Sequence, residues 1–249
     1  MDEQLVALYH RHVATAFDRN LRFAEFVAAK AGKSKPKFEV ATAVLAFGPK
    51  LKFEAPLLGS YAHSNGSWLW AWSNRNLKLT LTNRALANVV KVVAGRLAAP
   101  ALAHPGFSLE PLFGPELTKH AADVMGVILS RELDYSAYHV VVEEGHDSTI
   151  LVQDKRLKVT EKKPLERIFA VFPQVLAALP VTDQKGALIE FASDFGLKSV
   201  SEPGTLTVVH GKRELNATFD THDRLTKLEG ADGAAELPKA KKPAKAKKK

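Results

Sequence analysis

The sequence has 249 residues, of which 46% are hydrophobic and 25% charged, so it can form one large or two small globular domains and is not wholly disordered. It has no cysteine, which excludes disulfides, thiolate metal sites, iron–sulfur clusters and cysteine nucleophiles. The net charge is +8, but seven lysines lie in the last twelve residues and leave +1 for residues 1–237, so we expect no nucleic-acid-binding surface spread over the fold.

The first part of the chain predicts one long helix followed by strands. Over residues 2–31, apolar side chains recur at four-residue spacing, as an amphipathic helix requires: Leu5, Tyr9, Val13, Phe17 and Leu21, with Leu8 and Ala24 beside them. Alternating apolar and polar residues then predict strands over 38–44 and 51–55. The Asn65–Gly66 turn leads into a third strand, 67–74.

The rest of the chain alternates between pairs of helices and groups of short strands. Helices are predicted over 82–99 and 116–131, with a loop rich in proline and glycine (104–115) between them. Further along, the pattern predicts strands 138–143 and 149–153, helices 164–179 and 184–195, and strands 205–210, 214–220 and 224–228.

These elements predict an α+β fold in the order α-βββ-αα-ββ-αα-βββ. Tight turns within each strand group indicate an antiparallel, meandering sheet with the helices packed mainly on one face. We expect a single domain over 1–230, or a core over 1–180 with a C-terminal helix-and-hairpin extension over 181–230. Residues 231–249 are rich in lysine, alanine and proline and are predicted to be a disordered tail.

The most distinctive segment is Gly59–Asn74, GSYAHSNGSWLWAWSN, which holds all three tryptophans. In a strand, alternate side chains share a face, so Trp68, Trp70 and Trp72 are predicted to lie together. They either fill the core between sheet and helices or wall a ligand pocket. In the second case the nearest polar groups are those of Tyr61, His63 and Asn74.

The Gly-Ser…Trp-Leu-Trp-Ala-Trp-x-Asn signature after an N-terminal helix resembles a bacterial domain-of-unknown-function family defined by that motif. The resemblance implies no activity and supplies no catalytic residues. The element order over residues 2–180 also resembles the α+β fold of type III secretion chaperones, although a shared fold would not determine function.

A cluster of histidine and acidic residues surrounds the hairpin at 138–153. His139, Glu143 and His146 are candidate ligands for a divalent metal; alternatively, the turn is charged because it faces water. No nucleophile elbow, phosphate loop or dinucleotide fingerprint is present. We therefore predict no catalytic residue and no cofactor.

The basic tail is a candidate for weak, nonspecific contact with nucleic acid or another anionic surface. Its alternative role is to keep the chain in solution. The contact would be made by the seven lysines, Lys239, Lys241, Lys242, Lys245, Lys247, Lys248 and Lys249.

Without a catalytic signature, the sequence favours a non-catalytic protein-interaction module, an adaptor or chaperone-like domain, with an unidentified protein partner or a second copy of itself. The alternatives are a ligand-binding protein or enzyme with a tryptophan-walled pocket, and a nucleic-acid-associated protein that binds through its tail. No secretory signal and no apolar run of 18 residues is seen, so we expect a cytoplasmic protein without a membrane span.

Overall fold

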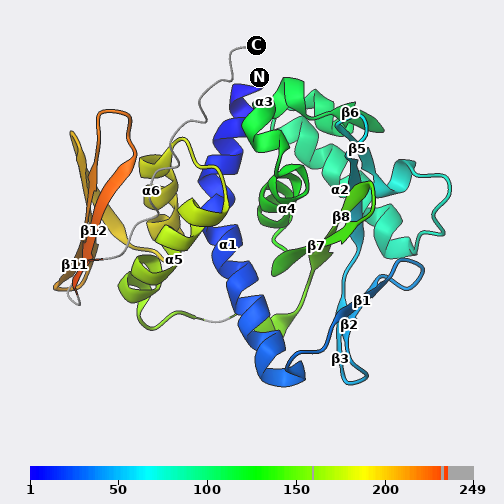
Figure 1. Cartoon of the computed structure of the whole chain (residues 1–249), viewed down its shortest axis with the longest axis horizontal. Helices are drawn as coiled ribbons and strands as arrows, with labels where there is room; N and C mark the ends of the chain where they lie inside the picture. Colours follow the sequence, from blue (N-terminus) through cyan, green and yellow to red (C-terminus); the bar gives the residue numbers. More distant parts are fainter. Residues whose placement is uncertain (159, 231–232, 235–249) are drawn as a thin grey trace, which may run out of the picture. The chain divides into compact units, whose positions relative to one another are not determined.

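The long N-terminal helix forms as predicted. In the computed structural model, which describes residues 1–158, 160–230 and 233–234, helix α1 spans Glu3–Ala31 (Figure 1). Asp2 caps its first turn, because Asp2 Oδ1 accepts a hydrogen bond from the Leu5 N–H at 3.1 Å. Gly32 ends the helix with φ of 59°, a conformation that glycine adopts without strain.

The buried face of α1 shifts along its length. Leu5, Tyr9 and Val13 are buried as expected, but Phe17 is half-buried, and Phe23 is buried instead. A four-residue step advances about 40° beyond a full helical turn, so a stripe of strict four-residue spacing turns away from the core within a few steps. The C-terminal half of α1 therefore presents a different face to the rest of the fold.

The chain divides into two compact units, residues 1–162 and 163–249, and each is described by itself. Eleven α-helices and strands of the first unit follow α1, in chain order: β1 (Pro36–Glu39), β2 (Val44–Phe47), β3 (Leu51–Glu54), β4 (Leu57–Ala62), β5 (Ser67–Trp70), α2 (Leu81–Arg96), β6 (Gly106–Ser108), α3 (Glu110–Thr118), α4 (Ala121–Glu132), β7 (Ala137–Glu143) and β8 (His146–Val152). Three short 3₁₀ helices accompany them, Ala71–Ser73, Pro100–Ala103 and Lys155–Leu157.

The strands of the first unit form two antiparallel sheets, in the orders β1-β2-β3 and β6-β5-β4-β8-β7. Helix α4 covers one face of the larger sheet, where Thr149 Oγ1 donates a hydrogen bond to the Ala122 carbonyl oxygen at 2.9 Å. Side chains on the other face of this sheet pack in one buried cluster with side chains of the smaller sheet and α1. This cluster includes Phe23, Phe47, Phe53, Ala137, Ile150 and Val152.

Several strands differ from the sequence prediction. The strand expected over 38–44 is instead two strands, β1 and β2, joined by a turn in which Ala43 has φ of 53°. Strand β4 was not predicted, and β6 with the start of α3 replaces the loop expected over 104–115. The alternation of apolar and polar residues does not show where one strand ends and the next begins when the turn between them contains small alanines.

In the second unit, two helices pack on one face of a five-stranded antiparallel sheet. The helices are α5 (Pro164–Ala178) and α6 (Gln184–Asp194), and Asp183 caps α6 through a hydrogen bond from the Gly186 N–H to its Oδ1 at 2.8 Å. The strands are β9 (Lys198–Glu202), β10 (Thr205–His210), β11 (Arg213–Phe219), β12 (Leu225–Gly230) and β13 (Gly233–Ala234), in the sheet order β13-β12-β11-β10-β9.

The α+β class is confirmed, and the described strands make three antiparallel sheets in place of the one expected. Strand β9 is an addition to the predicted order. None of the described helices is long and apolar enough to span a bilayer.

Candidate functional site

Two of the three tryptophans, Trp68 and Trp70, lie in the hydrophobic core. Strand β5 ends at Trp70, and Ala71–Ser73 is a 3₁₀ turn, so the strand predicted over 67–74 stops halfway. Trp68 and Trp70 are fully buried, with ring centroids 5.6 Å apart, and the half-buried Trp72 stacks on Trp70 at 4.6 Å. Because the rings of Trp68 and Trp70 have no exposed surface, they cannot wall an open pocket in this structure.

The polar residues predicted beside the tryptophans separate. Tyr61 lies half-buried on β4 opposite Trp68, while the side chain of His63 is 44% exposed in the following turn. His63 Nε2 lies 3.0 Å from Asp147 Oδ2 on β8. Asn74 instead closes its own turn, since its Oδ1 accepts a hydrogen bond from the Asn76 N–H at 3.1 Å.

The three residues predicted as metal ligands do not converge. Glu143 and His146 face each other across the β7–β8 hairpin, 2.8 Å apart and exposed. His139 lies four residues along β7, about 13 Å away at ~3.3 Å per residue, with its ring against those of Phe23 and Phe47. Within the described residues, no three histidine, aspartate or glutamate side chains are arranged to hold a metal ion. His139 is separated from Glu143 and His146 because three strand residues, 140–142, lie between His139 and Glu143.

A cavity of about 300 Å³ lies instead between α1 and the edge of β7. We call it the α1–β7 groove. The lining is mostly apolar, and four of its residues have polar side chains. The lining residues are Asn20, Phe23, Ala24, Val27, Ala28, Gly32, Phe47, Asp123, Tyr138, His139 and Val140. Ala24 and Ala28 are exposed, so the helix side of the groove is open to solvent.

At one part of the groove, a buried tyrosine and a half-buried carboxylate form a polar pair. Tyr138 OH donates a hydrogen bond to Asp123 Oδ1 at 3.1 Å. Burial raises the pKa of Asp123, opposed by this hydrogen bond and by His120, while the charge of Asp147 adds to the rise. The pKa of Tyr138 is also raised, first by burial and then by the nearby Asp123 charge. The site therefore holds an acid whose ionised form is poorly solvated.

The glycine in the middle of α4 allows this arrangement. A Cβ at Gly126 would lie 2.4 Å from Cδ2 of the Tyr138 ring, closer than any real contact. The ring therefore packs against α4 at Gly126, and its hydroxyl reaches Asp123 in the first turn of the same helix.

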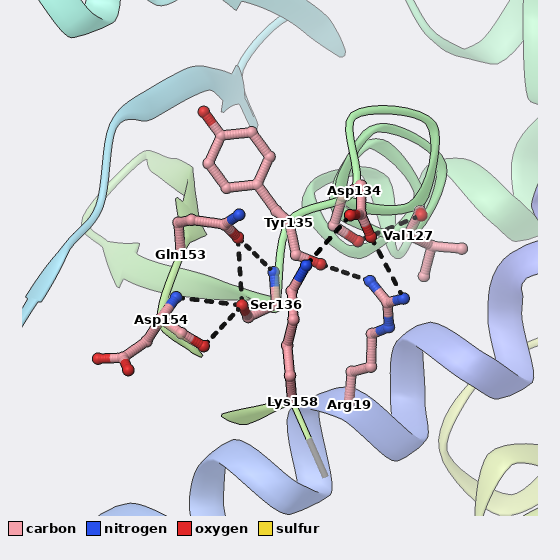
Figure 2. A network of polar contacts seen from close by, with 9 residues as sticks. Arg19, Val127, Asp134, Tyr135, Ser136, Gln153, Asp154 and Lys158 are labelled. Atoms are coloured by element: carbon pink, nitrogen blue, oxygen red, sulfur yellow. Dashed lines mark hydrogen bonds and ion pairs between the residues drawn. The ribbon is translucent and has the colours of Figure 1, made fainter. Parts of the chain in front are cut away.

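A polar network fixes the beginning of β7 beside α1 (Figure 2). Arg19 on α1 donates a hydrogen bond from Nη1 to the Tyr135 carbonyl oxygen at 2.6 Å, and its Nη2 lies 3.6 Å from Asp134 Oδ1. Ser136 in turn bonds Gln153 Oε1 through both its N–H, at 3.0 Å, and its hydroxyl, at 3.1 Å. These contacts hold the α4–β7 turn against α1 on one side and the end of β8 on the other.

The next contact along β7 shows which way the strand edge faces. The Tyr138 N–H donates a hydrogen bond to Asn20 Oδ1 at 3.0 Å, away from β8. In an antiparallel pair, alternate residues direct their N–H and C=O groups to the same side, so those of Val140 and Val142 point to this edge too. Among the described strands, β7 is the last of its sheet and pairs with β8 alone.

The α1–β7 groove was not predicted, although the sequence holds two signals of it. Val140, Val141 and Val142 are an unbroken apolar run where a half-buried strand should alternate, and Val142 is 76% exposed. Asp123 is the one charged residue among residues 121–130 of α4. Which helix face lies beside the strand edge depends on tertiary packing, which neither signal reveals.

Residues 6–155 match DUF6882, described as a family of unknown function. The match lies within the first unit and includes both the tryptophan segment and the α1–β7 groove. No curated protein and no solved structure matches the chain. The likeness to type III secretion chaperones stays a prediction, as does contact through the seven tail lysines, which lie outside the described residues.

Proposed function

The chain belongs to DUF6882, a family without an assigned function, and we propose from its geometry that it is a non-catalytic protein-interaction module that binds its partner in the α1–β7 groove. One observation carries this proposal: an apolar groove opens directly onto the edge of β7, with which no described strand other than β8 pairs. Loops and edges that face solvent usually carry polar or charged side chains, whereas this edge presents Val140 and Val142.

The shape of the groove supports a protein segment as the ligand. Two alanines on α1, Ala24 and Ala28, leave room where larger side chains would fill the space beside the strand. Phe23, Val27 and Phe47 provide an apolar floor, of the kind that favours burial of a partner's side chains. Patches that combine exposed apolar surface with a polar rim typically mark interaction sites.

A site-specific photocrosslink tests this proposal. A benzoylphenylalanine residue would replace Ala28, which lines the groove, or the neighbouring Ala29, which is exposed but does not line it. In cells that express the protein, we expect discrete adducts from position 28 that are absent from position 29 and that disappear when Ala24→Arg is added. Equal adducts at both positions, or none at position 28, would contradict the proposal.

A second candidate is the binding of a small ligand in the same groove. A cavity of about 300 Å³ lies at the lower end of the range for small-molecule sites, and it places Asn20, Asp123 and His139 around apolar walls. This replaces the predicted pocket at the tryptophans, because Trp68 and Trp70 are buried. The crosslink separates the two functions, since a small ligand gives no protein adduct.

A further inference from the structure

We propose that the groove takes one extended, basic peptide segment of a partner protein, which pairs with β7 as an added strand and places a lysine or arginine beside Asp123. This inference rests on the proposed function and deepens it, because it names the conformation and the charge of the bound segment. Three features of the groove support it: the edge of β7, the helix opposite that edge, and the charges around it.

The strand edge offers backbone hydrogen bonds in a regular row. Tyr138, Val140 and Val142 direct their N–H and C=O groups away from β8, as the Tyr138 N–H bond to Asn20 Oδ1 shows. Asn20 thus takes the place that a neighbouring strand would take at Tyr138. Beyond it, the row is open at Val140 and Val142, and Val142 is 76% exposed.

The helix opposite this row cannot supply the same bonds. Beyond Asn20, the α1 residues in the groove are Phe23, Ala24, Val27 and Ala28, and none of them has a side chain that donates or accepts a hydrogen bond. Val140 lines the groove among these apolar side chains, where a backbone group is costly to leave unpaired, whereas Val142 is exposed to water. An extended peptide satisfies the backbone groups of both residues, and its alternate side chains reach the apolar groove, which is the general way in which peptides add to a sheet edge.

The charges around the groove indicate a basic segment. On the β7 side, Asp123 lines the groove, and the β7–β8 hairpin adds Glu143, Glu144 and Asp147 with no lysine or arginine among them; on the α1 side, Lys30 and Lys33 flank the lining residue Gly32. Burial raises the pKa of Asp123, so a cation brought beside it would stabilise its ionised form. Complementary charge of this kind mainly selects the partner and increases the association rate.

The same charges argue against a second copy of the chain. If two copies paired through β7 in antiparallel register over Val140 and Val142, Glu144 of one copy would lie opposite Tyr138 of the other, whose hydroxyl is bonded to Asp123. Two acids would then meet in a partly buried position, which is unfavourable. A separate basic peptide avoids this repulsion.

The test starts from a phage-displayed library of random decapeptides selected on the full chain, with the Ala28→Arg variant used to remove peptides that bind elsewhere. We expect the enriched peptides to carry a lysine or arginine and alternating apolar residues. A synthetic copy should bind Ala28→Arg at least tenfold more weakly than the wild type and bind the matched control Ala29→Arg equally well. Selection of no peptide that depends on Ala28, or of peptides without a basic residue, would overturn the inference.

Strand pairing is tested on the same peptide by methylating its backbone nitrogens one at a time. We expect affinity to fall at every second position, because only alternate peptide N–H groups face β7. Val142→Pro, which removes an outward N–H without breaking the pairing with β8, should weaken binding at least tenfold, whereas Val142→Thr should not. Uniform tolerance of methylation, with Val142→Pro binding normally, would refute strand addition and leave the proposed interaction module intact. A dimer that Val142→Pro dissociates would identify a second copy as the occupant instead.

Discussion

The indole ring of Trp68 occupies the space that a side chain at position 59 would need. A Cβ built on Gly59 would lie 2.6 Å from Cζ2 of that ring and 2.7 Å from the Leu69 carbonyl oxygen. Gly59 on β4 and Trp68 on β5 are therefore a packed pair, in which the glycine lets a large ring lie against the sheet. The packing of Trp68 against Gly59 explains why the Gly-Ser…Trp-Leu-Trp signature combines a glycine with a tryptophan, without a bound ligand.

We accordingly expect Gly59→Ala to destabilise the first unit by about 2–3 kcal/mol, because the methyl group overpacks a rigid ring and a backbone oxygen. Chemical denaturation followed by tryptophan emission measures the change. The matched control is Gly95→Ala on α2, where an added Cβ meets no atom within 4 Å; this variant should gain up to about 1 kcal/mol from helix propensity. If both variants behave alike, the Gly59–Trp68 pair is not a packing constraint.

Elements with strong local patterns were predictable from the sequence, and the α1–β7 groove was not. Helix α1 follows from its capping residues, Asp2 before it and Gly32 after it. The β10–β11 pair follows from alternation. The division of the strands into three sheets depends on long-range pairing, such as Leu57 on β4 with Ile150 on β8, which no local pattern encodes.

The tryptophan segment was likewise predicted only in part from its local pattern. Their shared environment was predicted, and for Trp68 and Trp70 the core alternative fits the structure. The turn at Ala71 was not predicted, because the alternation of apolar residues continues through Trp72 after the strand has ended. The α1–β7 groove was missed for a related reason: alanines at positions 24 and 28 look like ordinary helix formers in sequence.

The raised pKa of Asp123 predicts how the free energy of unfolding changes with pH. The folded chain binds this proton more tightly than the unfolded chain, whose value is near the ordinary 3.8. The stability that protonated Asp123 provides is thus fully present below pH 3.8 and is lost as the pH rises through the higher folded pKa. Asp123→Asn cannot ionise, so we expect its unfolding free energy to rise relative to the wild type over that pH window and to level off above it.

Denaturant titrations of both proteins at a series of pH values measure this difference. Other titrating groups act in both proteins and cancel in the comparison. The asparagine keeps an oxygen that accepts the Tyr138 hydroxyl hydrogen bond. A difference that stays constant with pH would show that Asp123 ionises in the folded chain as easily as in water.

The first unit provides a test of domain organisation. We propose that residues 1–162 fold without the rest of the chain, because they contain the DUF6882 match, both of the first unit's sheets and the buried Phe23 cluster. All three tryptophans lie in this unit, so their emission reports on it alone. We expect the 1–162 fragment and the full chain to have the same blue-shifted emission and equal protection from iodide. Red-shifted, quenchable emission from the fragment would favour one domain over 1–230.

The basic tail holds seven lysines within residues 238–249, which lie outside the described structure. We propose that its seven lysines contact polyanions by charge and not by sequence, since residues 1–237 carry a net charge of only +1. Deleting residues 231–249 should remove DNA binding in a filter or anisotropy assay. For the full chain, log K should fall linearly with log salt, with a slope of about −0.9 for each phosphate contacted. A variant with the same tail residues in permuted order is the matched control and should bind as the wild type does, because counterion release depends on charge number. DNA affinity that survives the deletion would place the binding surface in the fold instead.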